Sequence, residues 1–304
     1  MSRSLRGSII LTLAALIWGS AFVAQSVAMD HVGPFTYQTV RSFLASGFIF
    51  LIAYVNSLIQ KRRGVYVKPT KASVKRLLIG GTVCGLALGV AANLQQFGIK
   101  YTTVGKAGFL TALYILFVPV LSLLLFKKKP SLKVWCGIGI AVVGLYLLCM
   151  NESLTVSKGD IFVFLCSVCF AVHIICCDKF AGNCDCFYLS CVQFFVNGIV
   201  SCILMLIFEP NGIAVFSQNF SAVWFTVAYA AIMSSGLAYT FQLLGQRDVN
   251  PTLASLLMSL ESVFAVLSGM VVLGQIPTLR EGIGCVLMFA AIILAQLPDK
   301  KKVE

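Results

Sequence analysis

Charged residues are scarce in this chain of 304 residues, at 11% against the roughly 25% that is typical of soluble domains. So few charges cannot cover a globular surface that faces water, and 59% of the residues are hydrophobic. The composition therefore excludes an ordinary soluble domain and indicates an integral membrane protein whose main solvent is lipid.

Acidic residues are the rarer of the charged types, with 11 Asp and Glu against 23 Lys and Arg. The basic residues cluster in short loops between apolar runs, which is typical of cytoplasmic membrane loops and not of a nucleic-acid interface. The sequence contains no G-x-x-x-x-G-K-[ST] loop and no H-E-x-x-H motif. We therefore expect no nucleic acid, no nucleotide hydrolysis, no cofactor, no metal and no enzymatic activity.

Histidine is also rare, with two residues, whereas cysteine is abundant, with twelve. Seven of the cysteines lie inside apolar runs, where cysteine behaves as a small hydrophobic residue. Cys176, Cys177, Cys184 and Cys186 surround one short loop. We favour the interpretation that these four residues are reduced, structural thiols. A metal or redox site is the alternative, so the role of the group stays open.

Long apolar runs predict ten membrane-spanning helices, each near the 20 residues that a bilayer requires. The first run continues to Val27, beyond the apolar core of a signal peptide, so it is interpreted as an uncleaved helix. The predicted spans are 7–28, 35–58, 76–98, 105–126, 132–150, 159–179, 187–208, 222–245, 252–273 and 279–297. The short loops between them leave no room for a soluble domain.

The distribution of Lys and Arg predicts the orientation. If the N-terminus is cytoplasmic, 18 of these residues fall on the cytoplasmic side and four, Lys100, Lys106, Lys158 and Arg280, on the outer side, with Arg41 inside a span. This bias follows the positive-inside rule. Both termini are therefore expected to be cytoplasmic.

The two halves of the chain resemble each other. At an offset of 152, "GSIILTLAALIWGSAF" aligns with "GDIFVFLCSVCFAVHI"; at an offset of 147, "LQQFGIKYTTVGKAGFLTALYILF" aligns with "FQLLGQRDVNPTLASLLMSLESVF". We expect two five-helix repeats, 1–151 and 152–304. Because five is odd, the second repeat is inverted relative to the first, which is the architecture of alternating-access transporters with a substrate site near the midplane.

Several segments are similar to the EamA family of the drug/metabolite transporter superfamily: "ALIWGSAFV", "YQTVRSFLA", "GIKYTTVGKAGFL" and "LESVFAVLSGMVVLGQIPTLREGIGCVLMFAAI". The resemblance covers nearly the whole chain. It departs where the family has a proline after the glutamate, here Ser262, and an acid after the glycine, here Gln275. The resemblance implies a secondary transporter, often an exporter, of amino acids or related metabolites in a bacterial inner membrane.

Polar and aromatic side chains inside the spans are candidates for lining a substrate cavity, since an unsatisfied amide in hydrocarbon is costly. For each one alone, hydrogen bonding between helices is the favoured interpretation, and it is the set as a whole that indicates a cavity. The candidates are Trp18, Gln25, Asn93, Gln96, Tyr114, His173, Tyr239, Gln242 and Glu261. The offset of 147 places Tyr114 on Glu261, so a polar group stands at this level in both halves.

Glu261 and Arg41 are the two charges that the sequence places within spans. Glu261 lies about nine residues into its helix, roughly 14 Å along a span of about 30 Å, so it must be paired, protonated or in a wet cavity. Contact with a substrate amine and proton exchange are both open roles for it. Arg41 is interpreted as an anchor that reaches the membrane interface, or as a gate residue or carboxylate-binding group.

These observations favour a multi-pass transporter in the cell membrane, and the resemblance implies that it is an exporter of an amino acid or amine-like solute. A nucleotide-sugar or lipid-linked substrate, and less so an intramembrane enzyme, are the alternatives. The expected partners are a small-molecule substrate and membrane lipid, with proton coupling left open and either a monomer or a dimer as the assembly. The substrate and the direction of transport are not determined by the sequence.

Overall fold

The structure is a computed structural model that describes residues 2–127, 130–149, 156–273, 276 and 278–297. The helices are α1 (Arg3–Ala28), α2 (Pro34–Arg62), α3 (Lys71–Ile99), α4 (Val104–Ala112), α5 (Tyr114–Phe126), α6 (Leu132–Cys149), α7 (Lys158–Ala181), α8 (Cys186–Phe208), α9 (Gly212–Gln218), α10 (Phe220–Tyr229), the π-helix η1 (Ala230–Ala238), α11 (Tyr239–Gln246), α12 (Pro251–Met258), α13 (Glu261–Leu273) and α14 (Leu279–Gln296). The described residues contain no strand. Gln275, the predicted repeat boundary at 151/152 and the basic segment 298–304 lie outside the described residues.

The prediction of ten spans is confirmed, since the described residues contain ten helical segments long and apolar enough to cross a bilayer. Several segments extend further than predicted, among them α1, which begins at Arg3, α2 and α3. α2 continues to Arg62, where the basic side chains of the last turn interact favourably with the negative end of the helix dipole. α3 begins at Lys71, because the Thr70 hydroxyl caps it by accepting from the Ser73 amide at 3.2 Å.

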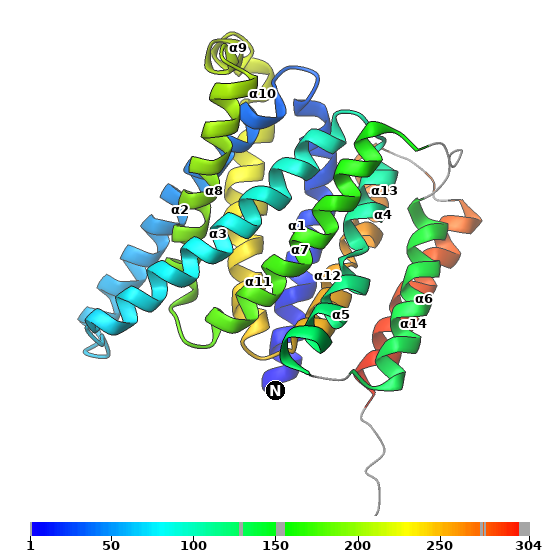
Figure 1. The fold of residues 1–304 in the computed structure, drawn as a ribbon, viewed down its shortest axis with the longest axis horizontal. Coiled ribbons are helices and arrows are strands. Elements are labelled where there is room, and N and C mark those ends of the chain that lie inside the picture. The colour runs from blue at the N-terminus through cyan, green and yellow to red at the C-terminus, as the bar shows by residue number, and fades with distance from the viewer. Residues whose placement is uncertain (1, 128–129, 150–155, 274–275, 277, 298–304) are drawn as a thin grey trace, which may run out of the picture.

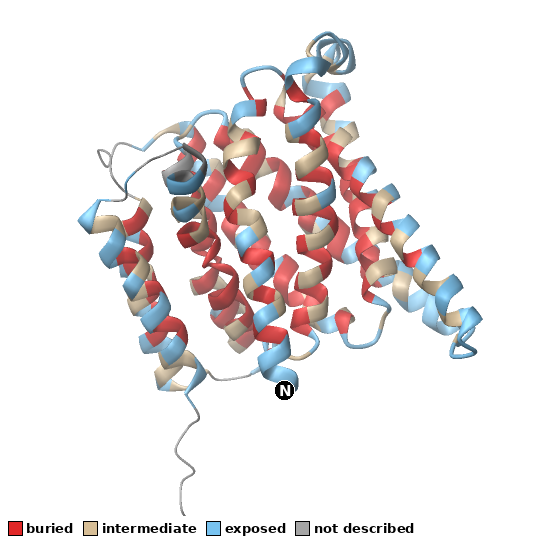
Figure 2. Ribbon diagram, turned by 180° about the vertical axis from the view of Figure 1, so that it is seen from behind, coloured by how far each residue is buried: buried red, intermediate tan, exposed pale blue. Residues whose placement is uncertain are grey.

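The helices pack as one bundle with α1 near its middle, in contact with η1, α11, α12 and α13 (Figure 1). α6 and α14 pair at one edge, while α2, α3 and α8 form the other edge, with α7 against α3. Buried residues face the interior of the bundle and exposed ones its perimeter (Figure 2). Because the perimeter exposes large apolar side chains such as Phe50 and Leu51, it is suited to contact with lipid.

Two predicted spans are each built from two helices. The span 105–126 breaks at Leu113, between α4 and α5, and the span 252–273 breaks at Ser259 and Leu260, between α12 and α13. The offset of 147 places Leu113 on Leu260. Each break therefore begins a new helix near the middle of a span, at Tyr114 in one half and at Glu261 in the other.

Close helix contacts also occur in corresponding pairs. A methyl group added at Gly7 of α1 would lie 2.9 Å from the carbonyl oxygen of Gly245 in α11. A methyl group added at Gly159 of α7 would lie 2.6 Å from the carbonyl oxygen of Gly98 in α3. The offset of 152 relates Gly7 to Gly159, and the offset of 147 relates Gly98 to Gly245. The same close approach therefore recurs at corresponding positions of the two halves.

α2 and α8 pack along each other and are joined by hydrogen bonds near both ends. Near one end, the Glu209 carboxylate accepts from the amides of Phe35 and Thr36 at 3.1 and 2.8 Å, and from the Thr36 hydroxyl at 2.6 Å. Near the other end, the hydroxyls of Ser57 and Tyr188 are 3.1 Å apart. The offset of 152 relates Ser57 to Glu209 and Thr36 to Tyr188. We call these the Glu209 end and the Ser57 end of the bundle.

Candidate functional site

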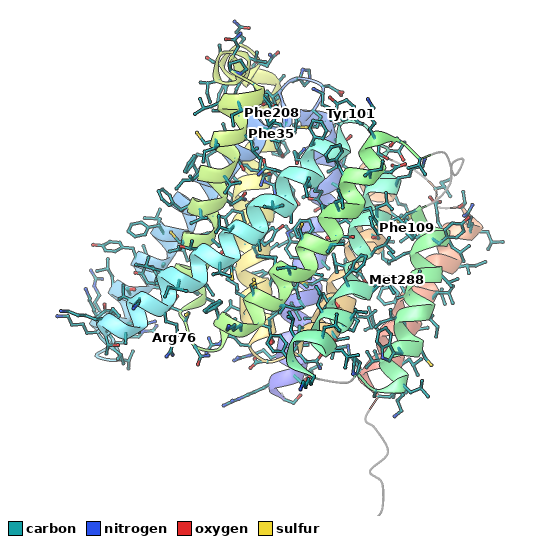
Figure 3. All side chains as sticks on the ribbon, in the orientation of Figure 1. Phe35, Arg76, Tyr101, Phe109, Phe208 and Met288 are labelled. Atoms are coloured by element: carbon teal, nitrogen blue, oxygen red, sulfur yellow. The ribbon has the colours of Figure 1, made fainter. Side chains whose placement is uncertain are left out.

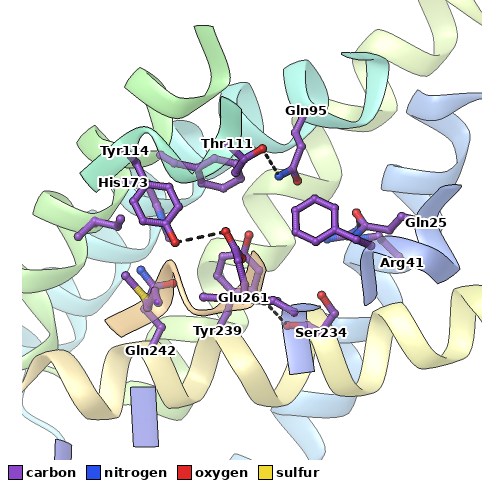
Figure 4. Close-up of a pocket in the computed structure, with 15 residues that line it drawn as sticks. Gln25, Arg41, Gln95, Thr111, Tyr114, His173, Ser234, Tyr239, Gln242 and Glu261 are labelled. Atoms are coloured by element: carbon purple, nitrogen blue, oxygen red, sulfur yellow. Dashed lines mark hydrogen bonds between the residues drawn. The ribbon is translucent and has the colours of Figure 1, made fainter. Parts of the chain in front are cut away.

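A cavity lies between α1, α2, α3, α4, α5, α7, η1, α11, α12 and α13, near the middle of the bundle (Figure 4). Its lining residues are Trp18, Phe22, Gln25, Arg41, Gln95, Thr111, Tyr114, Phe170, His173, Ile174, Ser234, Tyr239, Gln242, Met258 and Glu261. Only about 40 Å³ of it is wide enough to take the centre of a water molecule. The cavity therefore has room for a few waters, and a metabolite enters only if the helices separate.

Glu261 is buried in this cavity, with 5% of its surface exposed. It is the first residue of α13, where the positive end of the helix dipole favours a carboxylate. The hydroxyl of Tyr114, the first residue of α5, donates to Glu261 Oε1 at 3.2 Å. The two breaks in the spans thus bring into direct contact the two residues that the offset of 147 aligns, of which one is a carboxylate.

Arg41 also lines the cavity and is buried, with 3% of its surface exposed. This placement differs from the predicted anchor at the membrane interface, because α2 turns Arg41 toward α1, where its Nη1 donates to Gln25 Oε1 at 2.7 Å. The guanidinium also lies 5.8 Å from the ring of Tyr37. Among the described residues no carboxylate lies within 4.0 Å of Arg41, and its Nε has no hydrogen-bond partner there. A cation with donor capacity therefore faces the cavity.

Aromatic rings form one wall of the cavity. Trp18 packs edge-on against Tyr239, with ring centroids 4.8 Å apart, and Tyr239 in turn lies 5.9 Å from His173. The indole of Trp18 donates to the carbonyl oxygen of Ser234 at 3.3 Å. Ser234 belongs to η1, and the wider turns of a π-helix shift the backbone hydrogen-bond pattern, which is common at functional sites. The π-helix thus fixes the position of Trp18 in the wall.

Polar side chains complete the lining. His173 Nε2 lies 3.2 Å from Gln193 Oε1 and 3.3 Å from the thiol of Cys177, while its Nδ1 has no partner among the described residues. Gln95 donates through Nε2 to the Thr111 hydroxyl at 3.1 Å. These contacts hold a histidine and an amide at the edge of the cavity, so the wall offers both donors and acceptors.

The structure brings together eight of the ten residues that the sequence singled out, namely Trp18, Gln25, Arg41, Tyr114, His173, Tyr239, Gln242 and Glu261. Asn93 and Gln96 lie outside the cavity. Asn93 points to α8, where its Nδ2 donates to Ser201 Oγ at 2.8 Å. Gln96 is buried but turned away, because each residue rotates about 100° around a helix and Gln95 takes the position facing the cavity.

Sequence reasoning missed several lining residues, including Gln95, Thr111 and Ser234. Gln95 stands beside Gln96, so the sequence shows a polar pair on α3 but does not show which of the two residues faces the cavity. Thr111 carried no signal beyond a single hydroxyl in an apolar run. Ser234 accepts the hydrogen bond from Trp18 through its backbone carbonyl, a contact that no side-chain pattern in the sequence indicates.

The cysteine group near the loop 182–185 does not line this cavity, although Cys177 contacts the lining residue His173. Cys177 and Cys186 pack with Cys84 in a separate apolar cluster. Burial raises the pKa of the Cys184 thiol, in the turn between α7 and α8, above its ordinary value. Within the described part of the chain, no three or more His, Cys, Asp or Glu residues are placed to hold a metal ion. The arrangement is that of packed thiols.

The EamA-like transporter family model matches residues 5–150 and 157–297 of this chain, in agreement with the resemblance found in the motifs. A transporter of Archaeoglobus fulgidus is 27% identical over 291 residues, covering 94% of this chain and 84% of that protein. The transporter YyaM of Bacillus subtilis is 24% identical over 295 residues, covering 94% and 92%. A crystal structure of another protein superimposes with a TM-score of 0.74 over 96% of both chains at 18% identity, which shows a shared fold. The chain therefore belongs to the EamA-like transporter family and is a multi-pass membrane transporter.

Proposed function

We propose that this protein is a secondary transporter of the cell membrane that exports a small zwitterionic metabolite, an amino acid or an amine-like solute, by alternating access. The observation that carries the proposal is the lining of the central cavity. One guanidinium, from Arg41, and one carboxylate, from Glu261, are combined there with aromatic rings and amides. The direction of transport rests on the family resemblance.

The two charges suit the two ends of a zwitterion. Arg41 has a nitrogen, Nε, without a partner among the described residues, and a guanidinium binds a carboxylate through charge-assisted hydrogen bonds. Glu261 can accept from a substrate ammonium, and the nearby Trp18 and Tyr239 rings can add cation–π attraction. In this arrangement Tyr114 holds the Glu261 carboxylate in position through its hydroxyl.

Two five-helix repeats, 1–151 and 152–304, would supply the alternating movement, the second inverted relative to the first and both termini cytoplasmic. The paired glycine contacts and the paired breaks at Leu113 and Leu260 support this arrangement, since each has its counterpart at the offset of the repeat. In such transporters one set of contacts opens at one membrane face while its counterpart stays closed at the other.

The hydrogen bonds between α2 and α8 are suited to this role. Glu209 and Ser57 occupy corresponding positions but lie at opposite ends of the bundle. The central cavity is too small for a metabolite, so the conformation observed is closed around the site. Opening toward one membrane face requires the α2–α8 contact at that face to break. The Glu209 end would face outward and the Ser57 end the cytoplasm, as the distribution of Lys and Arg predicts.

A phosphate-bearing substrate, such as a nucleotide sugar or a lipid-linked sugar, fits the cavity less well. Phosphate groups favour several Arg or Lys side chains, and among the described lining residues Arg41 is the single Arg or Lys. We also assign no catalytic step to the site. The Cys177 thiol beside His173 is fully buried and does not line the cavity, so this thiol has no open face toward a substrate.

Coupling to protons would run through Glu261. A carboxylate near the middle of the bundle can exchange a proton with a cavity that opens alternately to the two sides. Glu261 would then bind either a substrate ammonium or a proton, but not both at once. This exclusion couples the transport of the substrate to that of the proton.

Counterflow in proteoliposomes tests the proposal. The purified protein is reconstituted, loaded with unlabelled amino acids and amines one at a time, and assayed for uptake of the labelled compound with and without a pH gradient. We expect exchange for at least one zwitterion and a loss of the response to the gradient in Glu261→Gln. Asp30→Asn, at an exposed carboxylate in the turn after α1, is the matched control. If no zwitterion exchanges, the substrate assignment is wrong; if Glu261→Gln still responds to the gradient, the coupling assignment is wrong.

A further inference from the structure

A second hollow lies on the lipid-facing side of the bundle, between α3, α7, α8 and the start of α2. It has a volume of about 710 Å³, far larger than the central cavity. Phe35 packs against Phe97 and Phe208, with ring centroids 5.9 and 5.6 Å apart. Phe97 also packs against Tyr101 and Phe162, with centroids 5.0 and 4.8 Å apart. Figure 3 shows Phe35, Phe208 and Tyr101 close together at this end of the bundle. We call this hollow the aromatic groove.

The length of the aromatic groove corresponds to one leaflet of a bilayer. Its lining runs along α3 from Val90 to Phe97 and continues in the following turn to Tyr101, which together is roughly 16 Å at 1.5 Å per residue. Half of a hydrocarbon core of about 30 Å is about 15 Å. Because the groove starts at the Glu209 end of the bundle and stops near its middle, it fits an acyl chain that enters from a single leaflet.

A polar hollow adjoins the aromatic groove and shares Lys100 and Tyr101 with it. Its other lining residues are Thr102, Thr103, Lys106 and Ser157, and its volume is about 330 Å³. Lys158 follows Ser157 as the first residue of α7. Two of the four basic residues that the sequence places on this side of the membrane, Lys100 and Lys106, therefore line this hollow, and a third, Lys158, is the chain neighbour of its lining residue Ser157.

The carboxylates near this hollow already have partners. Glu209 accepts three hydrogen bonds from the start of α2. Asp160 forms an ion pair with Lys106 at 3.8 Å and accepts from the hydroxyl of Thr102. The Lys100 ammonium lies over the Tyr101 ring, 6.0 Å from its centroid, at the junction of the apolar and polar hollows. Positive charge at the end of an apolar groove is complementary to an anionic headgroup on an acyl chain.

We propose that the aromatic groove and the adjoining polar hollow form a binding site for one anionic phospholipid taken from the surrounding bilayer. One acyl chain occupies the groove against the phenylalanine rings, and the phosphate lies beside Lys100. The hydroxyls of Thr102, Thr103 and Ser157 offer hydrogen bonds to the phosphate and to the ester groups. The bound lipid would fill the space between α3 and α8 at the Glu209 end, where their packing leaves the groove open.

Native mass spectrometry of the purified, delipidated protein tests this site. The protein is titrated with phosphatidylglycerol and, separately, with phosphatidylcholine of the same acyl chains. We expect one phosphatidylglycerol to be retained per protein and to bind several-fold more tightly than phosphatidylcholine. Lys100→Gln should weaken binding of phosphatidylglycerol by about fivefold, since one lysine near a membrane surface contributes about that factor to the affinity for an anionic lipid. Lys100→Arg should restore binding, and Lys71→Gln, at the far end of α3, should have no effect.

A pair of tryptophan variants tests the acyl-chain groove separately from the charge. Val90 lines the groove and Leu86, one turn earlier on α3, does not, although their exposed fractions are nearly equal at 49% and 50%. Val90→Trp should fill the groove and lower retention of both lipids, whereas Leu86→Trp should leave it unchanged. Equal retention of the two lipids by the native protein, or equal effects of the two tryptophans, would overturn the assignment. This binding assay does not depend on transport, so it stands apart from the proposed function.

Discussion

Glutamine in place of Glu209 should loosen the Glu209 end of the bundle and leave the Ser57 end unchanged. In the native protein the carboxylate receives three hydrogen bonds from the first turn of α2, at 2.6 to 3.1 Å. It also places a negative charge at the positive end of the α2 dipole. A glutamine side chain keeps the shape but removes the charge and one of the two acceptor oxygens.

The magnitude follows from these contacts. Hydrogen bonds to a charged group contribute about 1.5–3 kcal/mol, and loss of a favourable charge at a helix N-terminus costs about 0.3–1 kcal/mol. With part of the hydrogen bonding retained by the amide, we expect a net loss of about 1.5–3 kcal/mol. The population in which the Glu209 end is open should then rise roughly 10- to 150-fold. The neutral contact between Ser57 and Tyr188 contributes about 0.5–1.5 kcal/mol, so Ser57→Ala should open the other end by about tenfold at most.

Hydrogen–deuterium exchange followed by mass spectrometry measures both effects in the reconstituted protein. In Glu209→Gln, exchange should accelerate in peptides that cover the start of α2 and the end of α8. In Ser57→Ala, a smaller acceleration should appear at the end of α2 and the start of α8. Unchanged exchange at Phe35 and Thr36 in Glu209→Gln would refute the reasoning. So would an equal increase at both ends, because that pattern indicates general destabilisation.

Two further predictions concern helix packing and surface charge. Gly159→Ala should lower the thermal unfolding midpoint, since the new methyl group would lie 2.6 Å from the Gly98 carbonyl oxygen and overpacking costs about 1–3 kcal/mol. Gly139→Ala is the control and should not lower the midpoint, because no atom lies within 4 Å of its new methyl group. Equal shifts of the midpoint in the two variants would contradict the close contact at Gly159. Asp248→Asn should change the free energy of unfolding by less than about 1 kcal/mol, because its partner Arg6 is 59% exposed; a larger, salt-sensitive loss in denaturant titrations would show a stronger ion pair.

The ten spans were predictable because each one must be apolar over a bilayer thickness, and that constraint appears directly in the sequence. The breaks at Leu113 and Ser259 were not predictable, since no proline or glycine stands at either position. The π-helix η1 was not predictable either. Its residue Ser234 accepts a hydrogen bond from Trp18, which lies 216 residues away in the chain, and such a contact is not visible in the local sequence.

The residues of the candidate site were partly predictable for a related reason. Buried polar side chains are rare in a membrane span, so Tyr114, His173 and Glu261 stood out. Which face of α3 looks into the cavity depends on how the helix is rotated in the bundle, so the sequence pattern alone does not show that Gln95 lines the cavity rather than Gln96. The burial of Arg41 depends on the position of Gln25 on a neighbouring helix.

Measuring how each cavity charge recognises each end of the substrate gives the sharpest test of the proposed site. The ligands are an amino acid transported in counterflow, its methyl ester, which lacks the carboxylate, and the corresponding acid without the amine. Their inhibition constants are compared for the native protein, Arg41→Gln and Glu261→Gln, with Arg62→Gln, at an exposed position of α2, as the control.

We expect Arg41→Gln to weaken binding of the amino acid roughly 10- to 150-fold, as for a lost hydrogen bond to a charged group. Binding of the ester should be nearly unchanged. Glu261→Gln should weaken binding of the amino acid and of the ester. Binding of the acid that lacks the amine should be nearly unchanged. If each variant weakens all three ligands by the same factor, the two charges do not recognise separate ends of a zwitterion, and the assignment is contradicted.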